Sequence, residues 1–499
     1  MSRPGNGKVS RSPRVVIVGA GVAGICMGIK LKQAGIDTFT IYEKASSLGG
    51  TWRDNTYPGL ACDVPSRFYT YSFEPNPSWT RYFSSGPEIL RYLERTAARY
   101  GVDGHIRFRQ EVIEGSFAGG QWRIRTSTGE EATADFLVTA TGFLHHPKIP
   151  AIPGLDRFDG PVFHSARWDH RVELEGRRVA LVGTGSSGVQ ITVGIAGMVE
   201  RLLVFQRTAQ WIFPAPNRPY TRAVRWALGK SDRLDRIGYR AYRWIFERFF
   251  APAMLEDSWK RRVVTWICRQ WLKTIRDPNL RRRMTPDYEP MCKRLVMSGS
   301  YLRVMQQPNV DLVTDPIDHI DEHGIVTADG VRHDVDVIVL ATGFDGHAYM
   351  RPMNLVGEDG RTLADTWKTG PRAYRTVALP GFPNLFMLVG PNSPVGSQNV
   401  MTVVEAQVEH VMGWVRRFRD GLVTRVAPTE EATDRFNHEV VEALPGTVWL
   451  TGCNSWYMTE QGLPDVFPWG PDRHRQLLSE IDWSELQVEQ PDLERLPAE

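Results

Sequence analysis

Two stretches of the chain share one pattern of hydrophobic and polar positions. Each opens with a run of apolar, mostly branched residues, RVVIVG from residue 14 and RRVALVG from residue 177, and continues into a segment of helical periodicity. A second apolar run follows each helical segment, TFTIYEK in the first stretch and LLVFQRT in the second. The pattern predicts two strand, helix, strand units, and therefore an α/β fold with two Rossmann-like domains.

Glycines stand at the turn between strand and helix in both units. They are Gly19, Gly21 and Gly24 in the first unit and Gly183, Gly185 and Gly188 in the second. Glycines in this G-x-G-x-x-G spacing let the backbone approach a pyrophosphate, whose charge the helix N-terminus favours. We therefore predict two dinucleotide sites. The second site also includes Thr184, Ser186, Ser187, Gln190 and Thr208.

The residue that ends the second strand differs between the units. Glu43 stands 19 residues after Gly24, where a carboxylate accepts hydrogen bonds from a ribose 2′-hydroxyl. Arg207 stands 19 residues after Gly188, where a guanidinium would pair with a 2′-phosphate. The alternative for Arg207 is an exposed arginine at a strand end. The first unit is expected to bind a cofactor with free ribose hydroxyls, and the second to bind NADP.

Two further strands end on Ala-Thr-Gly, in DFLVTATGF from residue 135 and DVIVLATGF from residue 336. Chains that pair FAD with NADPH often end a strand of each module this way, where the path crosses between domains. The predicted domains are a poorly ordered N-terminus at 1–13, an FAD domain at 14–150 and 336–499, an NADP domain at 151–220 and 286–335, and a helical insertion at 221–285. The C-terminal part is expected to supply a segment that closes over substrate and NADP.

The cysteines argue against several other classes of protein. Cys26, Cys62, Cys268, Cys292 and Cys453 are odd in number, scattered and without a C-x-x-C pair. This argues against a disulfide framework, a zinc ribbon and a dithiol redox centre, and favours a reducing, cytoplasmic location. No metal site is expected. The N-terminus lacks an apolar signal region, and no stretch approaches the ~20 apolar residues that span a bilayer.

The charge of the chain is concentrated in one segment. Its formal net charge is +3, yet residues 221–283 hold 17 Lys and Arg against 6 Asp and Glu, with aromatic residues at helical spacing. The favoured interpretation is helices whose charged faces are solvated and whose apolar faces pack on a core. The alternative is a membrane-surface or partner-binding face. Nucleic-acid binding is not expected, because no recognisable module is present.

Three further motifs stand outside the glycine turns. The first, FDGPVFHSARWD at 158–169, fits the pattern F-x-G-x-x-x-H-x-x-x-W-(P/D), with His164 at its centre. The second, from Gly50, fits G-x-W-x-x-x-x-(Y/F)-P-G-x-x-x-D and ends on Asp63. The third, MCKRLV at 291–296, supplies a Lys-Arg pair. With these motifs the chain resembles the class B flavoprotein monooxygenases, and among them the Baeyer-Villiger monooxygenases, from about residue 14 to the SWY at 455–457.

The resemblance implies a reaction and its principal residues. Reduced FAD would react with O2 to give a C4a-peroxyflavin, which would attack a ketone carbonyl and yield an ester or lactone. Arg294 would stabilise the negative charge of the peroxide and of the adduct. Asp63 would hold that arginine, and Lys293 would help Arg207 to bind the 2′-phosphate of NADPH. The expected partners are a hydrophobic small-molecule ketone and O2, and the enzyme would be a monomer or a homodimer.

Further cofactor contacts are implied by position alone. Gly50, Thr51, Trp52 and Tyr69 match residues that line the flavin in relatives, and Val112 and Val400 match backbone contacts to FAD. Trp456 matches a tryptophan on the segment that closes over NADP, the alternative being an aromatic residue of the C-terminal core. The segment after SWY, which holds Pro464, Pro468, Trp469 and Pro471, departs from the pattern of ketone-converting relatives. The identity of the substrate is therefore open.

His164 by itself suggests a metal ligand or a general base, but no further ligand stands at metal-binding spacing from it. Its place between the two units predicts an organiser that couples domain movement to the flavin site. Three other functions remain as alternatives. One is an N- or S-oxygenating flavin monooxygenase. Another is a reductase, either a pyridine nucleotide-disulfide reductase, against which the missing C-x-x-C argues, or a simple electron-transfer reductase. The last is a nucleotide-sensing protein whose basic insertion binds a partner.

Overall fold

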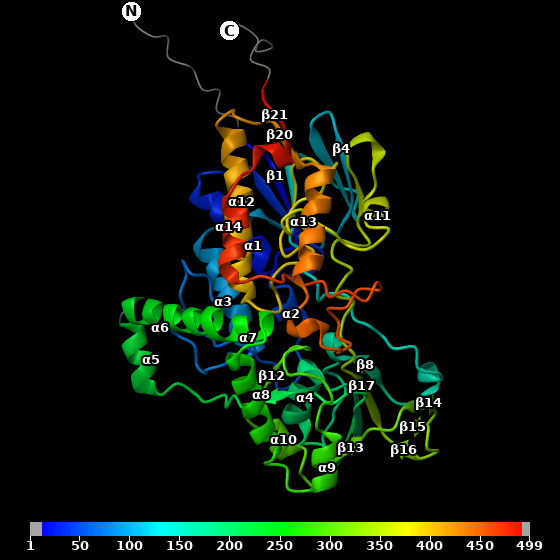
Figure 1. Cartoon of the computed structure of the whole chain (residues 1–499). Coiled ribbons are helices and arrows are strands. Elements are labelled where there is room, and N and C mark those ends of the chain that lie inside the picture. The colour runs from blue at the N-terminus through cyan, green and yellow to red at the C-terminus, as the bar shows by residue number, and fades with distance from the viewer. Residues whose placement is uncertain (1–11, 231, 492–499) are drawn as a thin grey trace, which may run out of the picture.

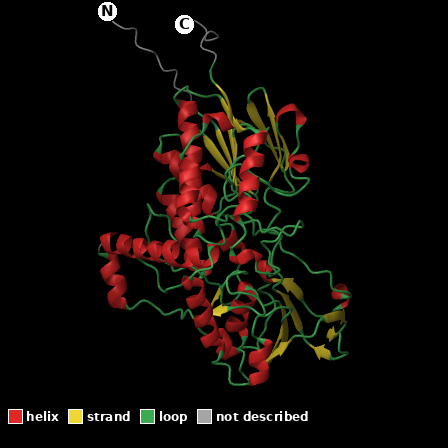
Figure 2. Cartoon of the chain, in the orientation of Figure 1, coloured by secondary structure: helices red, strands yellow, loops and turns green. Residues whose placement is uncertain are grey.

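The computed structural model describes residues 12–230 and 232–491, which form two lobes (Figure 1). Each lobe contains both strands and helices, and loops connect the two lobes (Figure 2). Residues 1–11, most of the stretch expected to be disordered, lie outside the described residues. Ser12 already bonds to the Thr38 hydroxyl, at 3.0 Å, so the described chain is anchored from its first residues.

The first lobe is built on a parallel sheet of five strands. In spatial order they are β19 (Leu385–Met387), β7 (Phe136–Thr139), β1 (Val15–Val18), β2 (Phe39–Glu43) and β3 (Ile106–Phe108). Every residue of β1 and β7 is buried, which is why these strands are continuous apolar runs rather than alternating ones. Because β19 pairs with β7, the chain returns to its first sheet after the second lobe is complete.

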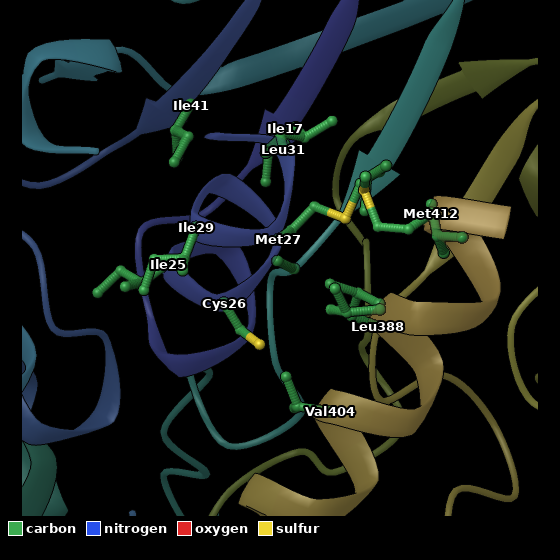
Figure 3. Close-up of a cluster of buried hydrophobic side chains, with 14 of the residues drawn as sticks. Ile17, Ile25, Cys26, Met27, Ile29, Leu31, Ile41, Leu388, Val404 and Met412 are labelled. Atoms are coloured by element: carbon green, nitrogen blue, oxygen red, sulfur yellow. The ribbon is translucent and has the colours of Figure 1, made fainter. Parts of the chain in front are cut away.

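Two helices pack on this sheet. The first, α1 (Val22–Gln33), follows the glycine turn, and α12 (Val400–Arg419) lies against it. Cys26 and Met27 of α1 are fully buried with Val404 and Met412 of α12 (Figure 3). This apolar contact fixes α1, and with it the turn that precedes the helix.

The second lobe repeats the plan. Its parallel strands, in spatial order, are β13 (Val310–Val313), β10 (Arg201–Phe205), β9 (Arg178–Val182), β17 (Val337–Leu340) and β8 (Val162–His164). The helix α4 (Ser186–Ile195) follows β9. The predicted domain boundary at 336 is therefore wrong by one strand. β17 completes the second sheet before the chain crosses back, because each Ala-Thr-Gly strand belongs to the unit that it ends.

An equivalent arginine–aspartate ion pair is present in both units. Asp135, just before β7, accepts hydrogen bonds from the Arg14 backbone N–H and guanidinium. Asp336, just before β17, accepts the same bonds from Arg178. In each unit the pair joins the start of the Ala-Thr-Gly strand to the start of the glycine-turn strand, which supports their parallel register.

Smaller elements complete each lobe. The first lobe adds an antiparallel meander of β4 (Val112–Ala118), β5 (Gln121–Thr126) and β6 (Glu131–Ala134), with β18 (Asn354–Val356) parallel to β4 at its edge. It also has an antiparallel pair of strands distant in sequence, β20 (Arg425–Pro428) and β21 (Leu486–Glu489). Its remaining helices are α2 (Thr51–Asp54), α3 (Gly86–Arg99), α11 (Leu363–Thr366), α13 (Glu430–Ala443) and α14 (Pro471–Ser479). The second lobe adds β11 (Ile212–Phe213), β12 (Val296–Met297), α10 (Tyr301–Val304), and the sheet of β14 (Ile317–Asp321), β15 (Gly324–Thr327) and β16 (Arg332–Asp334).

Helices fill the segment expected to be a helical insertion. They are α5 (Arg222–Gly229), α6 (Asp232–Ile245), a π-helical turn (Phe246–Phe250), α7 (Ala251–Leu255), α8 (Trp259–Leu272) and α9 (Pro278–Arg283). Val264 and Cys268 of α8 belong to the core of the second lobe, so this half is integral to that lobe. By contrast, α5 and α6 project from the body as an arm (Figure 1). None of the described helices is long and apolar enough to cross a membrane.

Candidate active site

The first glycine turn leaves room for a pyrophosphate. A Cβ added at Gly24 would stand 1.9 Å from the carbonyl oxygen of Gly19, so only glycine allows the helix to start this close to the strand. Gly21 and Gly50 face each other, and a Cβ on Gly50 would stand 3.2 Å from the Gly21 Cα. No described side chain caps the N-terminus of α1, whose N–H groups are thus available to an anion.

Glu43 lies at the edge of this turn. Its two carboxylate oxygens accept hydrogen bonds from the N–H groups of Ala20 and Ala45, both at 2.9 Å, and one oxygen lies 3.0 Å from the Arg53 guanidinium. A carboxylate has about four acceptor positions, so capacity remains for ribose hydroxyls. The carboxylate is both a support of the glycine loop and a suitable ribose partner, and the residues present fit FAD.

The second glycine turn has the same construction. A Cβ on Gly188 would stand 2.1 Å from the Gly183 oxygen, and α4 likewise starts at Gly185 with no side-chain cap among the described residues. The Thr184 hydroxyl donates to the Thr208 carbonyl at 3.1 Å, which ties the turn to the end of β10. Arg207 is exposed at the same end.

Lys293 lies close to Arg207. Burial lowers the pKa of Lys293, and the charge of Arg207 lowers it further. The Lys293 ammonium also lies 4.8 Å from the centre of the Tyr288 ring, a cation-π contact that holds it in place. Two cations that repel each other and come from distant segments form a suitable site for a 2′-phosphate, so these residues fit NADP.

Tyr57 joins the two lobes by contacting α4, the helix that follows the second glycine turn. Its hydroxyl donates to the Gln190 side chain of α4 at 3.0 Å and accepts a bond from the Ser187 hydroxyl at 3.2 Å. Burial raises the pKa of Tyr57 to about 12, so the hydroxyl stays protonated. Gly59 also packs closely against α4, since a Cβ on Gly59 would stand 2.4 Å from the backbone carbonyl oxygen of Gln190. The second motif therefore docks the first lobe on α4 of the second lobe.

Asp63, at the end of that motif, binds Arg294. The arginine Nε donates to Oδ2 and Nη2 donates to Oδ1, each at 2.7 Å. The Asp63 side chain is 16% exposed and that of Arg294 is 37% exposed. Burial acts to raise the pKa of Asp63, but the charge and hydrogen bonds of Arg294 outweigh it and the pKa is lowered. The Asp63 charge raises the pKa of Arg294, so both groups are ionised.

The expected flavin-lining residues occupy the first lobe around α2. Trp52 and Tyr69 are buried, and the Trp52 indole N–H donates to the Tyr69 hydroxyl at 3.1 Å. Thr51 is exposed at the start of α2. Val112 begins β4 and Val400 begins α12. Their contacts with FAD stay predictions.

The C-terminal segment lies on the second lobe. Trp456 stacks on Phe143, with ring centres 5.6 Å apart, so it joins this segment to the first Ala-Thr-Gly-Phe stretch. Tyr457 is buried beside Arg294. Burial raises the pKa of Tyr457, and Arg294 acts in the opposite direction. Sequence reasoning did not select Tyr457, although its place next to Trp456 in the SWY string was a usable signal.

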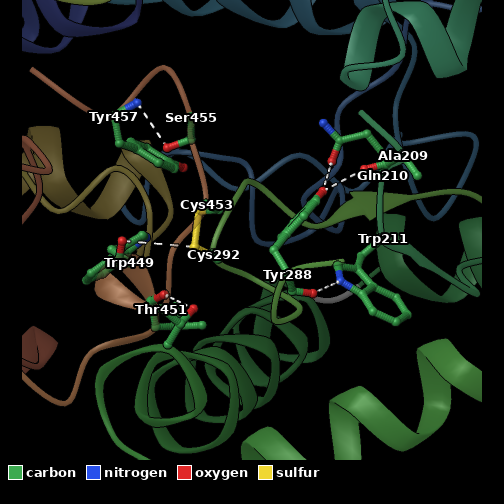
Figure 4. Close-up of a disulfide and its surroundings, with 11 residues drawn as sticks. Ala209, Gln210, Trp211, Tyr288, Cys292, Trp449, Thr451, Cys453, Ser455 and Tyr457 are labelled. Atoms are coloured by element: carbon green, nitrogen blue, oxygen red, sulfur yellow. Dashed lines mark hydrogen bonds between the residues drawn. A yellow bond between two sulfur atoms is a disulfide. The ribbon is translucent and has the colours of Figure 1, made fainter. Parts of the chain in front are cut away.

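A disulfide corrects one expectation from the cysteine pattern. Cys292, which immediately precedes Lys293 and Arg294, is bonded to Cys453 of the C-terminal segment, with Cα atoms 6.0 Å apart (Figure 4). The two residues are 161 positions apart, so their pairing depends on how the C-terminal segment packs and leaves no local spacing signal. Cys26, Cys62 and Cys268 are free and buried.

His164 is buried on β8. Its Nδ1 accepts a hydrogen bond from the Ala166 N–H at 3.1 Å, so the neutral ring carries its proton on Nε2. Burial lowers the pKa of His164, which favours the neutral form. The ring lies edge-on to Phe344 in the second Ala-Thr-Gly-Phe stretch, with centres 5.8 Å apart. The described residues contain no cluster of three or more metal-binding side chains.

Comparisons with known proteins identify the family. The flavin-binding monooxygenase-like family matches residues 12–352. An uncharacterised monooxygenase of Mycobacterium tuberculosis is 52% identical over 471 residues, which are 94% of this chain and 95% of the relative. A Baeyer-Villiger monooxygenase of Streptomyces coelicolor is 40% identical over 495 residues, 97% of this chain and 94% of the relative. An oxidised steroid monooxygenase bound to NADP superposes with a TM-score of 0.86 at 32% identity, covering 96% of this chain and 100% of that chain.

The cofactors agree with the two glycine turns, because solved structures of this architecture hold NADP, or FAD together with NADP. The chain belongs to the flavin-binding monooxygenase-like family, in which it is an FAD- and NADPH-dependent monooxygenase of the Baeyer-Villiger type.

Proposed function

We propose that this enzyme inserts one oxygen atom of O2 beside the carbonyl of a hydrophobic ketone. The products are an ester or lactone, NADP and water, with NADPH and one proton consumed. The observation that carries the proposal is Arg294, whose guanidinium donates two hydrogen bonds to Asp63. Ketone oxygenation places negative charge on oxygen before the ester forms, and a fixed cation stabilises that charge. FAD, when bound and reduced by NADPH, supplies the activation of O2.

The protein residues act on charge and position. Two of the five N–H groups of Arg294 donate to Asp63, the Tyr457 hydroxyl lies beside the guanidinium, and N–H groups that neither partner engages remain as donors. They are free to donate to an anionic oxygen at the active site. The carboxylate fixes the plane of the guanidinium, so little reorganisation is required when charge develops. Arg207 and Lys293 would hold the 2′-phosphate, and Trp456 would cover the nicotinamide side.

The substrate class follows from less direct observations. The steroid monooxygenase and the cyclohexanone monooxygenases among the similar structures are named for steroid and cyclic-ketone substrates. The region after Trp456, which departs from the motif of such relatives, is anchored here by Asp465. Its carboxyl accepts hydrogen bonds from the Asn392 N–H at 2.6 Å and from the Tyr349 hydroxyl at 2.5 Å. This anchor positions the segment that, by the family resemblance, helps to shape the substrate pocket.

Product analysis tests the proposal. The purified FAD enzyme is incubated with NADPH, 18O2 and a panel of cyclic, steroidal and aryl ketones, alongside amines and sulfides. We expect one 18O atom in an ester or lactone from at least one ketone. Oxygenation of the amines or sulfides with no ester from any ketone would instead assign the enzyme to heteroatom oxygenation. Hydrogen peroxide release alone, with every substrate, would exclude both.

A further inference from the structure

The α5–α6 arm has an apolar face that the fold does not bury. On one side of the arm, Tyr239 of α6 and Phe246 of the π-helical turn that follows pack against Phe68 of the first lobe, with ring centres 5.5 and 5.3 Å apart. Asp235 on the same side binds the Arg67 guanidinium at 2.9 Å. These contacts fix α6 on the body and determine which of its faces points outward.

The outward face of α6 is hydrophobic. Leu234, Ile237, Trp244 and Ile245 recur at helical spacing, and their exposed fractions are 46%, 60%, 65% and 39%. Trp226 of the neighbouring α5 is 69% exposed. Large apolar side chains gathered on one face, rather than scattered singly, indicate an interaction surface.

Cations border this stripe. Arg240 and Arg248 are exposed beside it and form no ion pair within the described residues. The Lys230 ammonium lies 6.0 Å from the ring centre of Trp226. With 17 basic and 6 acidic residues at 221–283, the segment is strongly positive.

Exposed tryptophans and arginines also alternate along α8. Its solvent face carries Trp259 and Trp266, which are 59% and 62% exposed, separated by the exposed Arg262 and followed by Arg269. The ring of Trp259 lies 5.9 Å from that of Phe249, in the turn that follows α6, so the start of α8 contacts the end of the arm.

We propose that the α5–α6 arm, with the adjoining face of α8, docks the enzyme on the surface of an anionic lipid bilayer. Tryptophan rings favour the headgroup boundary, and arginine stems lie along apolar surface while their charged ends reach phosphates. Negative lipid charge complements the positive segment. A second copy of the chain fits less well, since a symmetric contact would place this positive face against itself. The proposal does not depend on the identity of the substrate.

Vesicle sedimentation of the FAD enzyme tests the proposal. Vesicles of equal parts phosphatidylglycerol and phosphatidylcholine are compared with phosphatidylcholine alone, at ~0.05 M and ~0.5 M salt. We expect the enzyme to pellet with the anionic vesicles at low salt, and to stay largely in the supernatant with neutral vesicles or at high salt. Failure of the wild-type enzyme to pellet with anionic vesicles would overturn the proposal.

Matched variants locate the surface. Ile237→Ser/Trp244→Ser is expected to weaken partitioning at least about tenfold, because two side chains lose their burial at the boundary. Trp483→Ser is the control, since Trp483 is 53% exposed on the first lobe, away from the arm. Arg240→Gln/Arg248→Gln is expected to weaken binding and to flatten its salt dependence, whereas Arg303→Gln on α10 is not. All these side chains are exposed, and bound flavin with the thermal midpoint verifies folding.

Two outcomes would contradict the docking surface. One is unchanged vesicle binding by both arm variants. The other is a concentration-dependent dimer, seen by sedimentation velocity without lipid, that Ile237→Ser/Trp244→Ser disperses while the wild type does not bind vesicles. That result would assign the arm to self-association.

Discussion

Arg294 and Asp63 form an ion pair with two hydrogen bonds, although they lie 231 positions apart in the sequence. Asp63 belongs to the loop that docks the flavin lobe on α4, and Arg294 follows the cysteine that is bonded to the C-terminal segment. The pair therefore lies where the two lobes and the C-terminal segment meet.

Replacing Arg294 is expected to separate flavin reduction from oxygen transfer. Arg294→Ala should lower the rate of ester formation at least about 100-fold, because a preorganised donor to a developing oxyanion is lost. Anaerobic reduction of the flavin by NADPH should persist in stopped-flow absorbance. Arg294→Lys should recover only part of the ester yield, since an ammonium cannot form the two-fold contact with Asp63. A normal ester yield from Arg294→Ala would refute the assignment.

Arg207 is expected to select NADPH over NADH. Arg207→Ala should raise the KM for NADPH by roughly 10- to 100-fold, the loss of a charged hydrogen bond to the 2′-phosphate, with little change for NADH. Steady-state kinetics with both nucleotides provide the measurement. Arg201→Ala, at the other end of the same strand, is the control. An unchanged ratio of the two KM values in Arg207→Ala would contradict the assignment.

Loss of the disulfide is expected to destabilise the enzyme. Cys453→Ala should lower the free energy of unfolding by about 2–4 kcal/mol, because the unfolded chain is no longer cross-linked over a long loop. A reducing agent should lower the thermal midpoint of the wild type and leave that of Cys453→Ala unchanged. Non-reducing peptide mapping detects the Cys292–Cys453 link directly. A midpoint of the wild type that is insensitive to reductant, with both thiols alkylated in the native enzyme, would show that the bond is absent.

His474 is expected to make stability depend on pH. Burial, and then the charge of Arg475, lower its pKa in the folded chain to about 3. The unfolded chain, with a histidine pKa of about 6.5, therefore binds the proton first as pH falls. The free energy of unfolding should decrease below pH ~6.5, by about 2 kcal/mol at pH ~5, until the folded histidine is itself protonated.

Urea unfolding at pH ~7 and ~5 measures this effect. His474→Leu should show a smaller decrease between the two pH values than the wild type. His438→Leu, at an exposed position, should behave like the wild type. An equal decrease in His474→Leu and the wild type would mean that other groups control the acid response.

His164 is expected to affect turnover rather than flavin binding. His164→Ala should slow steady-state NADPH oxidation with substrate while the bound flavin content is retained, because the buried ring packs on Phe344 between the two units. His438→Ala is the exposed control. Turnover of His164→Ala equal to that of the wild type would show that the coupling role is wrong.

The local pattern of the sequence was sufficient for the two sheets, the two glycine turns, and the positions of Glu43 and Arg207. These features depend on neighbouring residues. A strand buried on both faces, the glycine turn after it and the next strand all lie within about thirty residues of sequence, so the local pattern determines each of them. The same locality explains the error at the second domain boundary. The two Ala-Thr-Gly strands have similar sequences, so their sequences do not indicate which sheet each strand joins.

The tertiary structure alone decided which distant groups meet. The motif resemblance suggested that Asp63 holds Arg294, but the two-fold contact arises from docking of Tyr57 on α4. Tyr457 beside Arg294 and the Cys292–Cys453 bond depend on the path of the C-terminal segment over the second lobe. The outward apolar face of α6 was equally undecided, because a helix with apolar residues on two sides reveals its buried side only through the contacts that the folded body offers.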